Sequence, residues 1–305
     1  MADDSVRVVC GPTAAGKSAL ALALAERRGL TIVSADSRQI YRGFDIGTAK
    51  PSPAERRRVP HRGIDVVPPD VRYSAAAWAE AAHGWIAEAA AAGRPPLVVG
   101  GTGFYLRALF APLFEEPPLD APRREALARE LAALDVASLR RWCERLDPAR
   151  AHLGRTQLLR AIEVALLTGR PLSEWHRATA RPSRLAARYL VVDPGAVLRD
   201  RIAARLEAML AAGWLDEVRR LSGTVPASAP AWNATGYGAV RDVASGRTTL
   251  PEARERILVE TRQYAKRQRT WFRHQLAGAD VTHLDPDDPD AATLVERWWA
   301  GEHLV

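Results

Sequence analysis

The segment "VRVVCGPTAAGKSALALALAERRG", residues 6–29, decides the fold. Its residues 11–18 match the pattern G-x-x-x-x-G-K-[ST] of a phosphate-binding P-loop. Glycines let successive backbone N–H groups point at phosphate oxygens, and the dipole of the following helix favours negative charge. We therefore predict a buried strand, a phosphate-binding turn and a helix that ends at Gly29.

Buried strands and helices alternate over the rest of the first third of the chain. "LTIVSAD" (30–36) predicts a strand, "YSAAAWAEAAHGWIAEAAAAG" (73–93) a helix, and "RPPLVVGGTGFYLRALF" (94–110) a strand, a turn and a helix. This order predicts an α/β fold: a P-loop NTPase-like core with a parallel sheet flanked by helices. The carboxyl ends of its strands should gather the P-loop, "SADSRQ" (34–39) and "GGTG" (100–103) into one cleft.

The character of the chain changes between residues 116 and 186. This stretch has a Leu/Ala periodicity typical of helices and carries 13 arginines against 9 acidic residues, a net charge of +4. "ARYLVVDP" (187–194) then predicts a strand that returns to the sheet, and the remainder reads as mostly helical. We predict a core formed by residues 1–115 and 187–305, with an all-helical insertion domain at 116–186.

Composition limits the setting and the partners. The net charge of +7 indicates a polyanionic partner, and only three of the 43 basic residues are lysines, namely Lys17, Lys50 and Lys266. A retained lysine indicates a site that needs a compact point charge. The two cysteines have no metal-binding or disulfide spacing. No signal-peptide pattern or membrane-spanning stretch is found, so we expect a reducing, cytoplasmic setting.

Three residues near the predicted cleft carry chemistry. Lys17 would reach a terminal phosphate, and the Ser18 hydroxyl would hold Mg²⁺. The third strand ends in Gly-Gly-Thr, where a P-loop NTPase would carry an acidic metal ligand. Asp36, at the end of another strand, is therefore a candidate general base, and the alternatives are a helix cap or the metal ligand of a kinase.

The segment "TRQYAKRQRTWFRHQ" (261–275) is rich in basic and aromatic residues. On a helix its cations form one stripe beside Tyr264 and Trp271, which suits phosphate contacts and base stacking in an RNA-binding surface. A solvated amphipathic helix with its aromatic side chains in the core explains the same pattern.

Several motifs together resemble the tRNA dimethylallyltransferase family. They are the P-loop, "SADSRQIYRGFDIGTAKP" (34–51), "GGTGFYLRAL" (100–109), "RAIEVALLTGRPLS" (160–173) and "TRQYAKRQRTWFR" (261–273), in the family's order over nearly the whole chain. The resemblance implies transfer of a dimethylallyl group from dimethylallyl diphosphate to N6 of adenosine-37, beside the tRNA anticodon. It also implies Mg²⁺ as cofactor, the anticodon stem-loop as partner and a monomeric, bacterial-type enzyme.

The resemblance also implies roles for individual residues. The catalytic residues would be Asp36, Lys17, Thr13 and Arg201, with Arg205 the second choice for a diphosphate-binding arginine. The diphosphate would be held by Gly11, Pro12, Thr13, Ala14, Ala15, Gly16, Lys17 and Ser18. The tRNA would be contacted by Asp36, Ser37, Arg38, Gln39, Thr102, Arg124, Thr156, Gln157, Arg160, Lys266 and Arg269.

One position departs from the family pattern, and other functions stay open. Thr156 and Gln157 stand where the family usually has a pair of polar or basic residues, often Gln-Arg, so one tRNA contact is in doubt, with Arg155 as its substitute. The alternatives are an adenylate isopentenyltransferase acting on free nucleotide, a P-loop nucleotide kinase and a non-enzymatic RNA-binding NTPase. The helical insertion and the basic segment near the carboxyl terminus argue against a small nucleotide acceptor.

Overall fold

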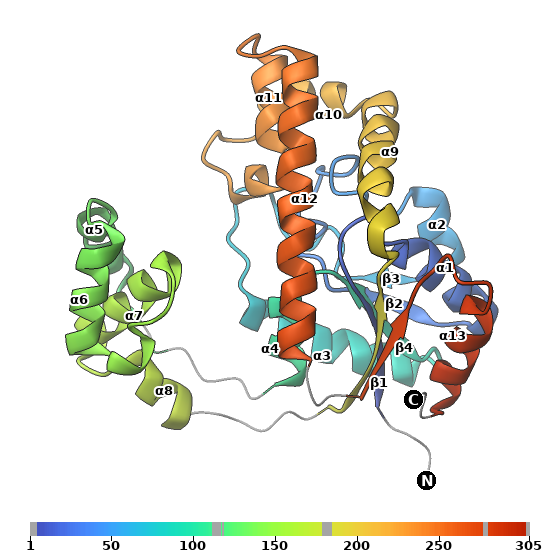
Figure 1. Ribbon diagram of the computed structural model, residues 1–305, viewed down its shortest axis with the longest axis horizontal. Helices are drawn as coiled ribbons and strands as arrows, with labels where there is room; N and C mark the ends of the chain where they lie inside the picture. The colour runs from blue at the N-terminus through green and yellow to red at the C-terminus, as the bar shows by residue number, and fades with distance from the viewer. Residues whose placement is uncertain (1–4, 112–116, 118, 179–184, 277–279, 303–305) are drawn as a thin grey trace. The chain divides into compact units, whose positions relative to one another are not determined.

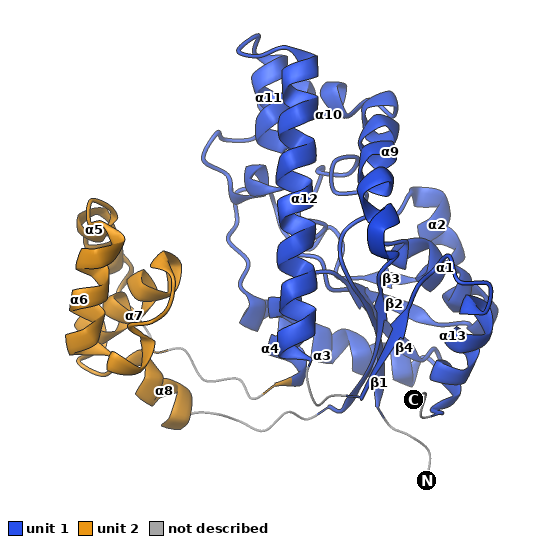
Figure 2. Ribbon diagram, viewed as in Figure 1, with its two compact units in different colours: residues 1–110, 185–305 blue, residues 111–184 orange. Residues whose placement is uncertain are grey.

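The computed structural model describes residues 5–111, 117, 119–178, 185–276 and 280–302. The chain divides into two compact units (Figure 2), and each is described by itself. The α/β unit comprises residues 1–110 and 185–305, and the helical unit comprises residues 111–184. The bounds of the helical unit stand a few residues from the range 116–186 expected from the sequence.

A six-stranded parallel sheet forms the centre of the α/β unit (Figure 1). The strands are β1 (Val6–Cys10), β2 (Thr31–Ser34), β3 (His61–Arg62), β4 (Pro96–Gly100), β5 (Ala187–Val192) and β6 (Asp280–Leu284). Their order is β3-β2-β4-β1-β5-β6, so the strand before the P-loop lies between β4 and β5. The predicted α/β fold with a parallel sheet is confirmed.

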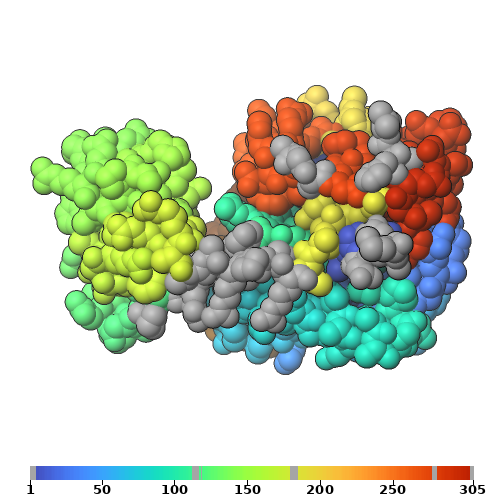
Figure 3. Space-filling view, turned by 90° about the horizontal axis from the view of Figure 1, so that it is seen from below, coloured from blue at the N-terminus to red at the C-terminus, as the bar shows by residue number. Residues whose placement is uncertain are grey.

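Helices cover the sheet and extend beyond it. Those of the α/β unit are α1 (Lys17–Arg28), α2 (Pro53–Arg58), α3 (Ala75–Ala91), α4 (Gly103–Phe110), α9 (Leu198–Ala211), α10 (Trp214–Ser222), α11 (Tyr237–Ala244), α12 (Leu250–Gln275) and α13 (Ala291–Ala300). Helix α1 ends at Gly29, as predicted, because this glycine adopts the left-handed conformation (φ 64°) that terminates a helix. Seen from below, the teal segment with α3 and the red segment with α13 flank the strands from opposite sides (Figure 3).

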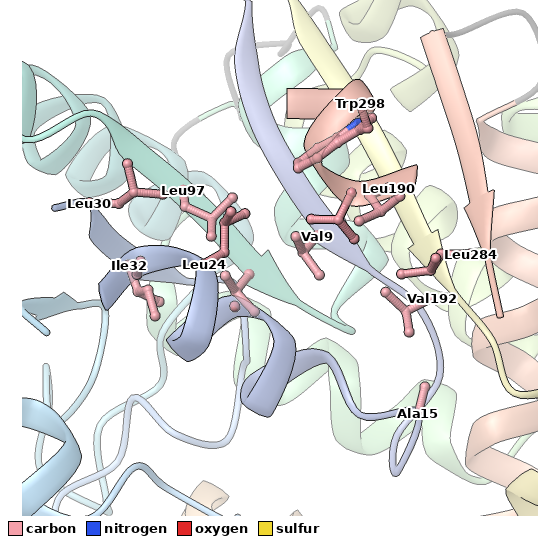
Figure 4. Packing of buried hydrophobic residues seen from close by; sticks show 14 of the residues in the cluster. Val9, Ala15, Leu24, Leu30, Ile32, Leu97, Leu190, Val192, Leu284 and Trp298 are labelled. Atoms are coloured by element: carbon pink, nitrogen blue, oxygen red, sulfur yellow. The ribbon is translucent and has the colours of Figure 1, made fainter. Parts of the chain in front are cut away.

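The main core lies between the sheet and helices α1 and α13. Leu24 of α1 is fully buried among strand residues that include Ile32 and Leu97 (Figure 4). Trp298 of α13 is also fully buried and lies close to Leu190 of β5. This packing fixes the start of α1, and with it the P-loop, at the carboxyl end of β1.

The two edge strands, β3 and β6, were missed in the sequence. The chain beyond residue 194 is mostly helical in the described residues, as predicted, but Asp280–Leu284 forms a strand that pairs with β5 in parallel register. Both strands are short and carry polar residues, so neither shows the continuous apolar run of a central strand. Their pairing depends on neighbours distant in the sequence.

The described part of the helical unit has four helices, α5 (Ala121–Ala132), α6 (Val136–Leu146), α7 (Arg155–Thr168) and α8 (Leu172–Ala178). Of these, α5, α6 and α7 pack around a small core of their own. Leu139, Leu158 and Ile162 are fully buried in this core. Cys143 is buried there too, and it is free, as is Cys10 of β1.

No helix in the described ranges is long and apolar enough to cross a membrane. The longest, α12, has 26 residues, and it is rich in arginine and glutamate.

Truncating Leu24 should destabilise the α/β unit. Leu24→Ala leaves a cavity in a fully buried site, and we expect the free energy of unfolding to fall by about 2–5 kcal/mol. Val259→Ala is the control, because Val259 on α12 is 48% exposed, and a change below about 0.5 kcal/mol is expected there. Urea unfolding followed by tryptophan fluorescence measures both. Equal losses in the two variants would contradict this placement of the core.

Candidate active site

The carboxyl ends of β1, β2 and β4 bring three segments into one cavity of about 330 Å³, which we call the P-loop cavity. Its lining includes Lys17 and Ser18 from the start of α1, Asp36 beyond β2 and Gly101 beyond β4. Because parallel strands end at the same edge of a sheet, these residues meet although they are far apart in the sequence. The predicted gathering of the P-loop, residues 34–39 and residues 100–103 is confirmed.

The start of helix α1 is open toward an anion. Its N-cap is Gly16, in the left-handed conformation (φ 94°), which makes no side-chain cap hydrogen bond. The first turn of α1 also contains no acidic residue. The free N–H groups and the positive end of the helix dipole therefore face the cavity mouth, as in a phosphate-binding P-loop.

Lys17 and Arg205 place two positive charges beside this helix end. The Lys17 ammonium donates to the carbonyl oxygen of Pro12 at 2.6 Å, and neither cation has an ion pair in the described part of the chain. Burial and, to a smaller extent, the nearby charge of Arg205 lower the pKa of Lys17 to about 8, against the opposing effect of Asp36. Burial likewise lowers the pKa of Arg205. The negative charge of Asp36 acts on both cations and raises their pKa values, but it forms an ion pair with neither, so two cations near one acid make this a site for a bound anion.

Arg201 and Arg205 lie one turn apart on α9 but have different partners. Arg201 donates to the carbonyl oxygen of Ala15 at 3.3 Å and forms an ion pair with Asp287, in the loop after β6. Arg205 lines the P-loop cavity directly. The sequence ranked Arg201 first, whereas the geometry favours Arg205 as the arginine available to a ligand.

Asp36 presents one of its two carboxylate oxygens to the cavity. Its Oδ1 accepts the backbone N–H groups of Arg38, at 2.8 Å, and Gln39, at 3.4 Å. Its Oδ2 accepts no hydrogen bond from the described residues. No helix follows Asp36 in the described residues, so it is not the helix cap considered as an alternative; it caps the turn at residues 37–40, which occupies only Oδ1 and holds the carboxylate in a fixed orientation.

Thr102 and Ser37 join the ends of β4 and β2 beside Asp36. The Ser37 backbone N–H donates to Thr102 Oγ1 at 3.0 Å, and the Thr102 backbone N–H donates to the carbonyl oxygen of Ala35 at 3.2 Å. Tyr264 of α12 also lines the cavity, and burial together with the negative charge of Asp36 raises its pKa to about 12. A neutral phenol thus forms part of the wall near the carboxylate.

The end of β4 has no room for an acidic side chain. β4 is the neighbour of β1, the place where P-loop NTPases carry their metal-binding acid. A Cβ on Gly100 would lie 2.2 Å from the carbonyl oxygen of Ala35, and one on Gly101 would lie 2.3 Å from Gln268 Nε2. The packing therefore excludes a carboxylate at residue 100, and one at residue 101 would displace the Gln268 amide.

Gln268 braces the P-loop from helix α12, and the sequence analysis missed it. Its side chain is buried, its Oε1 accepts the Thr13 backbone N–H at 2.8 Å, and its Nε2 donates to the Gly101 carbonyl oxygen at 2.8 Å. The amide thereby ties the P-loop to the β4 turn. The sequence shows that Gln268 lies in the basic segment 261–275, but it does not show that the Gln268 side chain points into the protein.

Of the residues of the α/β unit predicted to contact tRNA, some have exposed side chains, and others already bond to groups of the protein. Arg38 is partly exposed beside Asp36, and Lys266 is exposed on α12. The Gln39 amide donates to the carbonyl oxygens of Thr48, at 3.2 Å, and Ala49, at 3.1 Å. Arg269 pairs with Asp193 after β5. Their contacts to RNA stay predictions.

In the helical unit, two of the predicted tRNA contacts share one acid. Arg124 and Arg160 both pair with the buried Glu163 of α7. Thr156 and Gln157 are exposed on the first turn of α7. Arg155, considered as a substitute contact, donates to the carbonyl oxygens of Ala132 and Leu134 at the end of α5.

The fold and the site define the class of protein. A P-loop without an acid at the end of the adjacent strand β4, together with the Asp36 carboxylate lining the same cavity, suits a group transferase that holds a phosphorylated donor. The family model described as "IPP transferase" matches residues 39–275, and that described as "Isopentenyl transferase" matches residues 4–61. The chain belongs to the IPP transferase family, which confirms the resemblance noted in the sequence.

Named relatives and solved structures agree with this membership. A tRNA dimethylallyltransferase of Halorhodospira halophila is 46% identical over 92% of this chain and 93% of its own length. That of Deinococcus radiodurans is 41% identical over 97% and 98%. A tRNA isopentenylpyrophosphate transferase of Bacillus halodurans has a TM-score of 0.67 at 33% identity, covering 97% of this chain and 95% of that one.

The charge of Lys17 should make anion binding depend on pH. An anion favours the protonated ammonium, so deprotonation as the pH rises through about 8 should weaken binding. We expect the Kd of inorganic diphosphate, measured by calorimetry, to rise about tenfold from pH 7 to pH 9.

Diphosphate itself changes protonation between pH 7 and pH 9, and Lys17→Arg is the control for this effect. Its guanidinium stays charged over this range, so any pH dependence that remains comes from groups other than residue 17. Its Kd should change less than that of the wild type. The same pH dependence in both proteins would rule out Lys17 as the titrating group.

Removing the Gln268 amide should loosen the P-loop. Gln268→Leu keeps the volume but leaves the Thr13 N–H and the Gly101 carbonyl without their partner, and we expect diphosphate binding to weaken about tenfold. Gln263→Leu, at an exposed position of the same helix, should bind normally. An equal Kd of diphosphate for the two variants, measured by calorimetry, would contradict the role of Gln268 in holding the P-loop.

Proposed function

We propose that this chain transfers a dimethylallyl group from dimethylallyl diphosphate to N6 of adenosine-37 of tRNA and releases diphosphate. One observation carries the proposal: the same cavity holds two unpaired cations and a carboxylate oxygen that accepts no hydrogen bond from the described residues. The cations suit a leaving diphosphate, and the carboxylate suits an amine that must lose a proton. The names of the relatives point to the same reaction.

The P-loop stabilises the leaving group. Cleavage of the bond between C1 of the prenyl group and its bridging oxygen leaves the bond electrons on that oxygen and cationic character on the allyl carbon. The N–H groups at the start of α1, Lys17 and Arg205 can stabilise the added negative charge on diphosphate. Gln268 holds the Thr13 segment so that these donors are in place before the reaction.

Asp36 acts on the nucleophile. The lone pair of N6 forms the new bond to C1, and one N6 proton passes to Asp36 Oδ2, the oxygen left free by the turn at Arg38 and Gln39. Thr102 and Ser37 lie beside Asp36 and can orient the incoming base. The base must leave the anticodon loop stack to reach this cavity, as in other enzymes that act on a nucleobase.

The residues present fit a magnesium ion bound together with the substrate. Mg²⁺ prefers oxygen ligands and is held in phosphate sites by few protein groups plus substrate phosphates and water. The described residues contain no group of three His, Cys, Asp or Glu side chains placed to hold a metal, whereas the exposed Ser18 hydroxyl borders the cavity. Ser18 would hold the ion, which would neutralise diphosphate charge when bound.

The helical unit would supply further contacts to the anticodon stem-loop. Its composition is basic, and Thr156 and Gln157 are exposed at the start of α7, so backbone phosphates are the natural partners. The proposed catalytic residues all come from one chain, which suits a monomer. A tRNA substrate suits a cytoplasmic enzyme.

The alternatives find no support in the named relatives, none of which is a nucleotide kinase or an enzyme of free nucleotides. The kinase alternative also lacks the acid beside β1, since packing leaves no room for one at Gly100, and one at Gly101 would displace the Gln268 amide.

The reaction is tested with two labelled donors and two acceptors. Dimethylallyl diphosphate labelled in its prenyl carbons and ATP labelled in its γ-phosphate are each incubated with unmodified tRNA or with AMP. We expect label only in tRNA, and only from the prenyl donor. Label in AMP, or transfer of phosphate from ATP, would overturn the proposal.

Removing the base should stop turnover without stopping RNA binding. Asp36→Asn keeps the shape but cannot accept the N6 proton, so we expect kcat to fall by a factor of about 10²–10⁴. The Kd of an anticodon stem-loop should stay within about threefold, since phosphate contacts dominate affinity. Asp216→Asn, an exposed carboxylate on α10, is the control. A high residual rate with lost RNA affinity would show that Asp36 binds RNA instead.

A further inference from the structure

The loop of residues 45–51 forms a wall beside the P-loop. Thr48, Ala49, Lys50 and Pro51 line the P-loop cavity. Asp45, Ile46 and Ala49–Pro51 also line a second cavity of about 770 Å³, which Lys17 and Ser18 line as well. The loop therefore borders both cavities that reach the Lys17 ammonium, and its position decides the shape of the anion site.

A buried carboxylate on α10 fixes the amino end of this loop. Glu217 is 2% exposed, and its Oε2 accepts the backbone N–H groups of Asp45 at 3.1 Å and Ile46 at 2.8 Å. Its Oε1 accepts the hydroxyl of Tyr237 at 2.7 Å. No cation pairs with Glu217 among the described residues, so three hydrogen bonds hold this buried charge.

Aromatic side chains hold the loop backbone close to Glu217. A Cβ on Gly47 would lie 2.2 Å from Trp214 Nε1 and 2.5 Å from Tyr237 Cε2. The loop thus packs directly on two rings, and even a methyl group at residue 47 would push it away.

A buried ammonium fixes the carboxyl end. The Lys50 side chain is 1% exposed and donates to the carbonyl oxygen of Tyr41 at 2.8 Å, to Asp45 Oδ1 at 2.6 Å and to Asp65 Oδ1 at 2.7 Å. Three acceptors around one nitrogen match the three N–H bonds of a lysine, which a planar guanidinium cannot supply. This explains why a lysine stands here in a chain that otherwise favours arginine.

The fixed loop in turn holds the segment that carries Asp36. The carbonyl oxygens of Thr48 and Ala49 accept the two N–H groups of the Gln39 amide. The backbone N–H of Gln39 donates to Asp36 Oδ1 at 3.4 Å. A path of hydrogen bonds therefore leads from Glu217, which touches neither cavity, to the carboxylate proposed as base.

We infer that Glu217 and Lys50 are positioning residues that clamp the loop 45–51, and that this loop sets both the diphosphate site and the orientation of Asp36. The effect on transfer rests on the proposed function, whereas the effect on diphosphate binding does not. Both effects act through the loop, so they should appear together when either clamp is lost.

The test compares Glu217→Ala, Glu217→Gln and Asp242→Asn. Asp242, on α11, pairs with Arg247 and Arg256 and makes no contact with the loop, so it serves as the matched control. We measure the Kd of inorganic diphosphate by calorimetry, the melting temperature, and kcat and KM for dimethylallyl diphosphate. Glu217→Ala should weaken diphosphate binding about tenfold and lower kcat, while Glu217→Gln stays within about threefold. The amide oxygen can still accept both loop N–H groups, and its NH₂ can donate to the Tyr237 oxygen.

Gly47→Ala provides a second variant that keeps both clamps and displaces the loop by its added methyl group. It should reproduce the loss of diphosphate affinity seen in Glu217→Ala. Normal diphosphate binding in both variants would overturn the inference, as would an equal loss in Asp242→Asn. If the wild type transfers the prenyl group and Glu217→Ala has the same kcat and the same Kd for diphosphate, the clamp is refuted and the proposed function stands. If the wild type binds diphosphate but transfers no prenyl group, only the proposed function is refuted.

Discussion

The arrangement of the site depends on two positive charges that share a single nearby acid, Asp36, and form no ion pair with it. Lys17 and Arg205 lie beside the open end of α1, without an ion pair in the described ranges. Burying cations costs free energy unless a counter-charge arrives, so the fold keeps an anion site at the cost of some stability. Burial lowers the pKa of Lys17 to about 8 for the same reason, because it disfavours the charged ammonium. The hydrogen bonds of Gln268 and the loop 45–51 keep the P-loop that carries Lys17 in place.

The same packing separates this site from that of a nucleotide hydrolase. Glycines at the end of β4 let Ala35 and Gln268 approach so closely that an acidic side chain there would clash with one of them. The carboxylate is instead displaced to Asp36, beyond the next strand, where one oxygen is held by a turn and the other faces the cavity. The phosphate cradle thus follows β1 and the base follows β2, with β4 between these two strands, a separation that suits attack on a carbon attached to the phosphates rather than on phosphorus.

Local patterns in the sequence predicted the parts of the site that depend on neighbouring residues. The P-loop, α1 and the strand before Asp36 follow from glycine spacing and apolar runs. Gln268 and Glu217 could not be found in this way, because each meets its backbone partners across at least 167 residues of chain. The ranking of Arg201 above Arg205 stays a prediction, and the ion pair of Arg201 was hidden from the sequence for a related reason. Asp287, which pairs with Arg201, follows the edge strand β6, whose short polar sequence gave no strand signal.

The fate of the bridging oxygen tests most directly whether the P-loop holds a leaving group. Dimethylallyl diphosphate carrying ¹⁸O between C1 and phosphorus is incubated with the enzyme and an unmodified anticodon stem-loop, and both products are analysed by mass spectrometry. Cleavage between carbon and oxygen predicts that all of the ¹⁸O appears in diphosphate and none in the RNA. Dimethylallyl alcohol carrying ¹⁸O, or a phosphorylated RNA, would show cleavage at phosphorus and contradict the role assigned to the cavity.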